Sequence, residues 1–122
     1  MSDRIDLARG LARKAENELE TARLLLEAGG PYDTACFHCQ QAAEKYMKAL
    51  LTYHDRDYPF THDLEELTAL CQETVRGLDL ATPSMVKLTN YAVGLRYDAF
   101  LQPERDETAR AFEAAQNVRT AV

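Results

Sequence analysis

Apolar residues recur at steps of three and four near the start of the chain, which puts them along one side of an α-helix. They are Ile5, Ala8, Ala12, Ala15, Leu19, Ala22 and Leu26. Gly29, Gly30 and Pro31 follow, and this sequence favours a left-handed C-cap and a break in the helix. The pattern predicts one long helix, after which the chain reverses.

The same spacing returns after Pro31 and predicts a second helix antiparallel to the first. Its apolar positions are Ala35, Cys39, Ala42, Tyr46, Ala49 and Tyr53. The alanines would allow the two helices to approach closely. The polar segment 54–59 ends in Pro59, so we expect a loop there.

Capping signals predict a third helix after this loop. Thr61 is the expected N-cap, and acidic residues follow where they favour the positive end of a helix dipole. These residues are Asp63, Glu65 and Glu66. The helix should fade by Gly77, because glycine is a poor helix former.

Two prolines mark the starts of the remaining helices. Thr82 and Pro83 fit an N-cap and a first helical position, so a fourth helix is predicted through Leu95. After Pro103, apolar residues return at helical spacing. They are Ala109, Phe112, Ala115 and Val118. With no strand-like alternation, the sequence predicts an all-α, up-and-down bundle of four to five helices.

Length and charge narrow the class of protein. The 122 residues, 46% of them hydrophobic, suit a single domain over 1–122 with one core. The formal net charge of −6 disfavours broad binding to a polyanion unless cations cluster locally.

The N-terminus and the cysteines indicate a cytoplasmic protein. The first residues are charged and lack the apolar region of a signal peptide, and no apolar run approaches a membrane span. Cys36, Cys39 and Cys71 form an odd set that suits buried thiols in a reducing compartment. Cys36 and Cys39 share a helical face, as zinc ligands can, but a fourth ligand is not evident. We therefore expect no metal and no cofactor.

Three motifs lie in the second helix and after the following loop: Gln-Gln-Ala-Ala-Glu-Lys at 40–45, Lys-Ala at 48–49 and His-Asp-Leu at 62–64. These motifs resemble those of the HEPN family (higher eukaryotes and prokaryotes nucleotide-binding). The resemblance spans nearly the whole chain. It implies a HEPN-like helical bundle that forms a homodimer or pairs with a small nucleotidyltransferase.

Polar residues of the motif are candidates for contact with a nucleotide or its phosphate. Gln41, Lys45 and Lys48 lie away from the apolar seam of the second helix, and Glu44 has the spacing for an ion pair with Lys48. A solvated face is the favoured interpretation of this stretch, and contact with a ligand is the alternative. His62 is a further candidate, although a histidine at a helix start can also cap, pack or line a cleft.

Ribonuclease members of the family carry an arginine and, after four to six intervening residues, a histidine. Histidine can move the ribose 2′-hydroxyl proton while arginine holds the phosphate. Here Arg96 matches the arginine, but positions 101–103 are leucine, glutamine and proline. The resemblance therefore implies that the usual ribonuclease motif is incomplete.

Arg96 also begins a candidate phosphate- or base-binding surface with Tyr97 and Asp98. An Arg96–Asp98 ion pair at a dimer seam is the alternative. The favoured function is a HEPN subunit, part of a toxin–antitoxin or substrate-binding pair, that binds nucleotide or a nucleotidyltransferase. The alternatives are a ribonuclease toxin using Arg96 with His38 or His62, and a ligand-free dimerisation module.

Overall fold

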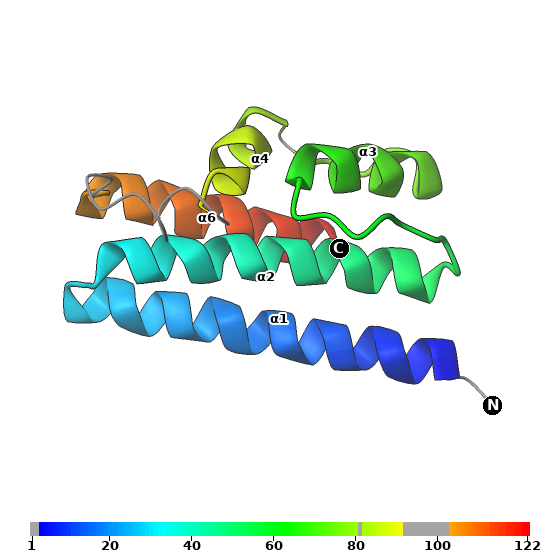
Figure 1. Cartoon of the computed structure of the whole chain (residues 1–122), viewed down its shortest axis with the longest axis horizontal. Helices are drawn as coiled ribbons and strands as arrows, with labels where there is room; N and C mark the ends of the chain where they lie inside the picture. Colours follow the sequence, from blue (N-terminus) through cyan, green and yellow to red (C-terminus); the bar gives the residue numbers. More distant parts are fainter. Residues whose placement is uncertain (1–2, 81, 92–102) are drawn as a thin grey trace.

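The computed structural model describes residues 3–80, 82–91 and 103–122, and these residues form a bundle of five helices (Figure 1). The helices are α1 (Asp3–Ala28), α2 (Tyr32–Tyr53), α3 (Leu64–Thr74), α4 (Thr82–Thr89) and α6 (Arg105–Ala121). No strand occurs in these ranges. The predicted all-α helical bundle is confirmed.

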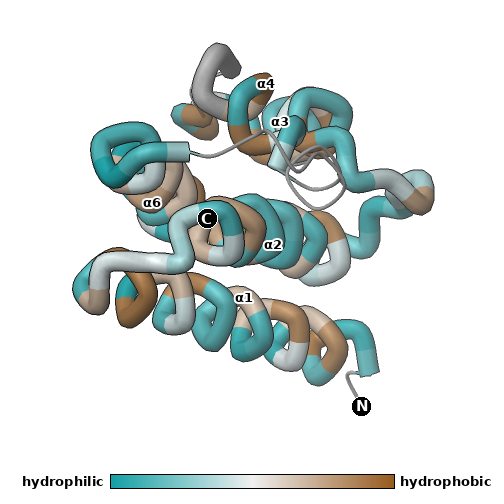
Figure 2. Tube along the Cα trace, turned by 60° about the vertical axis from the view of Figure 1, so that its left-hand side comes forward, coloured by the Kyte–Doolittle hydropathy of each residue, from teal (hydrophilic) through white to brown (hydrophobic). Residues whose placement is uncertain are grey.

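Helix α2 occupies the centre of the bundle. It contacts α1, α3, α4 and α6, and in Figure 2 it lies between α1 on one side and the other helices on the opposite side. Its buried apolar residues are Ala35, Cys36, Cys39, Ala42, Ala43, Tyr46, Met47, Ala49 and Leu51. Because α2 has neighbours on several sides, its buried surface is wider than the single stripe seen in the sequence.

The turn between α1 and α2 has the predicted glycine C-cap. Gly29 and Gly30 have φ values of 90° and 120°, in the region that favours glycine. The Gly30 N–H donates to the Leu25 carbonyl at 2.8 Å, and the Gly29 N–H to the Leu26 carbonyl at 3.3 Å. These two bonds form a Schellman motif, which ends α1 and lets α2 run back along it.

The start of α3 differs from the prediction. Asp63, not Thr61, is the N-cap, and its carboxylate accepts a hydrogen bond from the Glu65 N–H at 3.0 Å. The Thr61 hydroxyl instead accepts from the Asp63 N–H at 3.0 Å. The cap must stand directly before the first helical residue to reach the free N–H groups, and Thr61 lies too far upstream.

Most of the other helix limits agree with the sequence. Helix α3 ends at Thr74, before Gly77, α4 begins at Thr82, and α6 follows Pro103. Helix α4 ends at Thr89, and Asn90 and Tyr91 form a turn, so the predicted unbroken helix through Leu95 is wrong at this point; residues 92–95 lie outside the described residues. Within the described ranges, every helix is too short or too polar to cross a membrane.

The three cysteines are free thiols with no exposed surface, as the sequence indicated. Burial raises the pKa of Cys36 to about 11 and that of Cys71 to about 12. These thiols stay protonated near neutral pH and act as small core residues.

Candidate functional site

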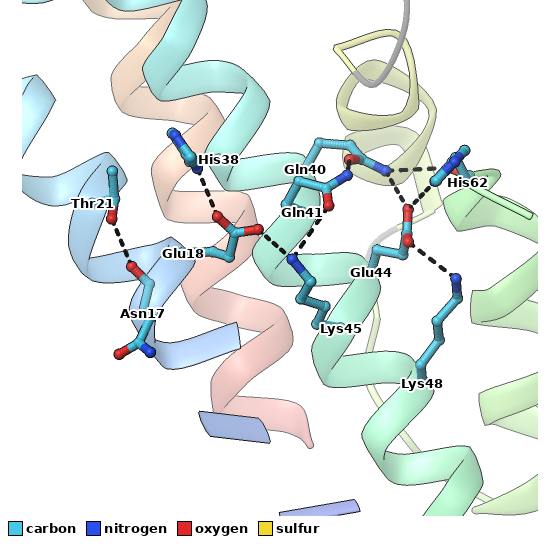
Figure 3. Close-up of polar contacts among 10 residues, drawn as sticks. All are labelled: Asn17, Glu18, Thr21, His38, Gln40, Gln41, Glu44, Lys45, Lys48 and His62. Carbon is cyan, nitrogen blue, oxygen red and sulfur yellow. Dashed lines mark hydrogen bonds and ion pairs between the residues drawn. The ribbon is translucent and has the colours of Figure 1, made fainter. Parts of the chain in front are cut away.

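A continuous set of polar side chains crosses the middle of α2 and connects it to α1 and to the segment before α3 (Figure 3). We call this set the α2 polar network. Its members are Glu18, His38, Gln40, Gln41, Glu44, Lys45, Lys48 and His62. The network has one histidine at each end and two buried or half-buried carboxylates between them.

Glu44 is the centre of the first half. Its side chain is only 6% exposed, and its carboxylate accepts hydrogen bonds from three donors. His62 Nδ1 lies 2.8 Å from Oε1, Gln40 Nε2 lies 3.0 Å from the same oxygen, and Lys48 Nζ lies 3.0 Å from Oε2. The predicted Glu44–Lys48 ion pair is thus confirmed.

These donors keep Glu44 ionised. Burial by itself raises the pKa of a carboxyl group, but the bonds from Gln40, His62 and Lys48 outweigh burial and lower the pKa of Glu44 below its ordinary value. An ionised carboxylate can only accept hydrogen bonds, so Nδ1 of His62 must carry the proton. In the neutral ring, Nε2 is then the free acceptor.

Glu18, on α1, is the centre of the second half. Its carboxylate accepts a bond from Lys45 and lies 2.7 Å from Nδ1 of His38. Lys45 also donates to the side-chain oxygen Oε1 of Gln41 at 3.3 Å, and Nε2 of Gln41 donates to Oε1 of Gln40 at 2.7 Å. Gln41 therefore links the two halves, and the path from His38 to His62 has no gap.

Aromatic rings stand beside the His62 end of the network. The Lys48 ammonium lies 5.7 Å from the centre of the Tyr58 ring and 5.9 Å from that of Phe60. The Phe60 and His62 rings meet edge to face at 6.0 Å. Phe60 is 96% exposed and the His62 side chain 51% exposed, so this end of the network is open to solvent.

The structure brings together four of the residues singled out in the sequence. Gln41, Lys45, Lys48 and His62 all belong to the network, and His38 lies at its opposite end. The interpretation of this stretch as a solvated face is wrong. Glu44 is buried, and Gln41, Lys45 and Lys48 are half-buried, because α1 and the segment before α3 cover this side of α2.

The sequence patterns did not identify four residues of the site or beside it: Gln40, Glu18, Tyr58 and Phe60. The helical spacing of Gln40 and Glu44 offered a signal, since residues four apart share a face. Glu18 and Phe60 gave no such signal, because each meets the network only through tertiary contact. Arg96, Tyr97 and Asp98 lie outside the described residues, so their position relative to His38 and His62 is not part of this geometry.

The described residues contain no group of three or more histidine, cysteine, aspartate or glutamate side chains placed to hold a metal ion. Within these ranges, Cys36 and Cys39 contact other core groups. The Cys36 thiol lies 3.5 Å from the Thr108 hydroxyl, and burial strongly raises the pKa of Cys39. Both observations fit a packing role for these residues.

The fold and the network define an all-α protein of the HEPN class. A family model described as the HEPN domain matches residues 8–122, and the chain therefore belongs to the HEPN domain family. The chain is also similar to a solved structure, that of TT1696 from Thermus thermophilus. The two share 26% sequence identity with a TM-score of 0.76, over 94% of this chain and 98% of that one. No curated protein matches the chain.

Proposed function

We propose that this chain is the nucleotide-binding subunit of a HEPN homodimer that serves a partner nucleotidyltransferase. The observation that carries the proposal is the convergence of His62 and Lys48 on the buried carboxylate of Glu44. This arrangement fixes His62, whose side chain is 51% exposed, beside Lys48, whose side chain is 13% exposed. The chain forms a single HEPN domain in this proposal.

Charge favours a phosphate at this point despite the overall acidity of the chain. The formal net charge is −6, so long-range attraction of an anion is absent. At the site, however, the Lys48 ammonium faces the negative charge of Glu44, and His62 adds a second positive charge only when its ring is protonated. A protonated His62 also presents Nε2–H as a donor to a phosphate oxygen, a charge-assisted bond.

Membership in the HEPN family, and not the geometry of the site, supports the proposed partner and the proposed dimer. A HEPN domain without a histidine at positions 101–103 suits a binding role in a two-component pair, either a toxin–antitoxin system or a substrate-binding subunit. A homodimer would present two copies of the site. Copurification with a small nucleotidyltransferase would support the pairing.

Adenosine 5′-monophosphate should bind the wild-type protein and stabilise it against heat. A ligand at about 100 times its Kd contributes roughly 2.7 kcal/mol, enough to raise Tm by several degrees. The His62→Gln variant should lose most of this shift. His54→Gln is the matched control, because His54 is an exposed histidine that makes no side-chain hydrogen bond or ion pair within the described residues.

Thermal unfolding with a panel of nucleotides measures these shifts. A wild-type Tm that no nucleotide changes would contradict the proposal and would favour a ligand-free dimerisation module. An equal loss of the shift in both histidine variants would show that His62 has no special part in binding.

The second candidate is a ribonuclease, and one observation favours it. Glu44 holds Nδ1 of His62, and Nε2 has no hydrogen-bond partner within the described residues, the arrangement that orients a histidine for general acid–base chemistry. Arg96 would then hold the phosphate, and His62 would take the part of the family's missing histidine. His38 makes the same Nδ1 contact, with Glu18, but it is the less suitable base because its side chain is only 24% exposed, against 51% for His62.

A further inference from the structure

Phe60 is the most exposed large apolar residue in the part of the chain that the structure describes. Its side chain is 96% exposed, whereas Leu7 is 60% and Tyr53 is 54% exposed. A phenylalanine in water gains none of the free energy that burial of its ring would provide. This exposed apolar ring lies directly beside the α2 polar network, next to Lys48 and His62.

Two side chains lie near the Phe60 ring, and most of its surface is exposed. Lys48 lies 5.9 Å from its centre, and the His62 ring meets it edge to face at 6.0 Å. Lys48 and His62 are themselves fixed by Glu44, and the neighbouring backbone is tied by the Thr61–Asp63 hydrogen bond. The groups that flank the ring are thus ordered, while its remaining surface is free.

We infer that Phe60 is the platform on which the base of a bound nucleotide stacks, with the phosphate beside Lys48 and His62. This inference rests on the proposed function and names its ligand as one that carries a nucleobase. Stacking of bases on aromatic side chains is a common source of affinity and does not depend on the identity of the base. A cation beside the ring adds attraction for both the ring and the phosphate.

The surrounding charge favours a free nucleotide over a long RNA strand. Exposed carboxylates flank Phe60 along the chain, at Asp57, Asp63, Glu65 and Glu66. They would repel the successive phosphates of a polyanion, whereas a mononucleotide needs to place only one phosphate group. Stacking itself is little affected by these charges, so the base can bind even on an acidic surface.

The absence of tryptophan from the sequence makes a direct test possible. Phe60→Trp places a single tryptophan at the platform, which can be excited apart from the six tyrosines, and a stacked base quenches its emission. Tyr53→Trp is the matched control: Tyr53 is also exposed and also meets a histidine edge to face, at 5.1 Å, but no lysine or arginine lies over its ring within the described residues. Both variants change an exposed side chain and should fold.

Three ligands separate the contributions. Adenosine 5′-monophosphate should quench Phe60→Trp in a saturable way, and ribose 5-phosphate, which lacks the base, should not. An oligoadenylate should bind more weakly per base than the mononucleotide. Calorimetry should show that Phe60→Leu weakens the mononucleotide about tenfold, or about 1.4 kcal/mol, while ribose 5-phosphate binds as to wild type.

The outcomes distinguish the inference from the proposed function. If the mononucleotide binds Phe60→Leu as tightly as wild type and quenches neither tryptophan, the platform is wrong and nucleotide binding stands. Equal quenching of both tryptophans also overturns the platform. If neither the mononucleotide nor ribose 5-phosphate binds wild type, both proposals fail. A tighter oligoadenylate would overturn the preference for a free nucleotide.

Discussion

Glu44 shows how a single buried charge organises its surroundings. Three donors from α2 and from the residue before the α3 cap meet on its carboxylate, and Lys48 is in turn flanked by two aromatic rings. Removal of the charge would leave Lys48, whose side chain is 13% exposed, without its counterion. A largely buried cation without a partner is strongly destabilising.

Glu44→Gln should therefore lower the free energy of unfolding by about 3 kcal/mol at neutral pH. The native pKa of Glu44 is lowered from 4.5, so its stabilising effect is complete above pH 4.5. This effect is lost as the pH falls through 4.5 and then through the lower native pKa. Urea unfolding of both proteins between neutral pH and the acid limit of folding measures the difference.

The difference in the free energy of unfolding between wild type and Glu44→Gln should consequently decrease as the pH falls. Glu16, whose pKa is also lowered, mainly by a hydrogen bond from Tyr46, is present in both proteins and cancels in the comparison. A gap that stays constant down to acid pH would show that the carboxylate charge does not stabilise the fold.

Sequence patterns predicted the residue types at the site but not their burial. Helical spacing alone assigned α2 one buried face, and on that basis Glu44 and Gln41 were expected to face solvent. Burial of Glu44 follows from the covering segment 54–63, whose path depends on tertiary contacts such as those of Tyr58 and His62. No local pattern encodes that path.

The helices follow local rules more closely than the site does. The Gly29-Gly30 cap, the Thr82 start and the stop before Gly77 could all be identified from residue type, because each depends on backbone conformation within a few residues. The cap of α3 was assigned to Thr61 instead of Asp63, since both residues favour the N-cap position and sequence alone does not separate them.

Two glycine substitutions, one within α1 and one just after it, should have opposite effects. At Gly29 φ is 90°, and an added Cβ meets no atom within 4 Å, so Gly29→Ala should destabilise by about 1 kcal/mol through backbone strain alone. Gly10 lies within α1 and is equally open, so Gly10→Ala should stabilise by roughly 0.5–1 kcal/mol.

Thermal or urea unfolding of the two variants measures these effects directly. Destabilisation of equal size in both would indicate that the alanine methyl group clashes at both sites. Such a result would contradict the assignment of the Gly29 effect to its left-handed conformation.

At the scale of the whole molecule, the family assignment followed from the motifs at 40–45 and 62–64, and the HEPN domain match over residues 8–122 confirms it. The partner and the oligomeric state could not be derived in this way. They depend on which surfaces bind each other, and a single sequence does not show this. Our central proposal is that this HEPN chain binds a nucleotide and leaves RNA uncut, and its motive is that positions 101–103 after Arg96 hold no histidine.

Incubation of the purified wild-type protein with single-stranded RNA in EDTA at neutral pH tests this claim most directly, with the RNA length followed by electrophoresis. We expect the RNA to keep its full length throughout the incubation. Fragments that disappear in both Arg96→Ala and His62→Gln would contradict it, since they would show that His62 has replaced the missing histidine as the catalytic base.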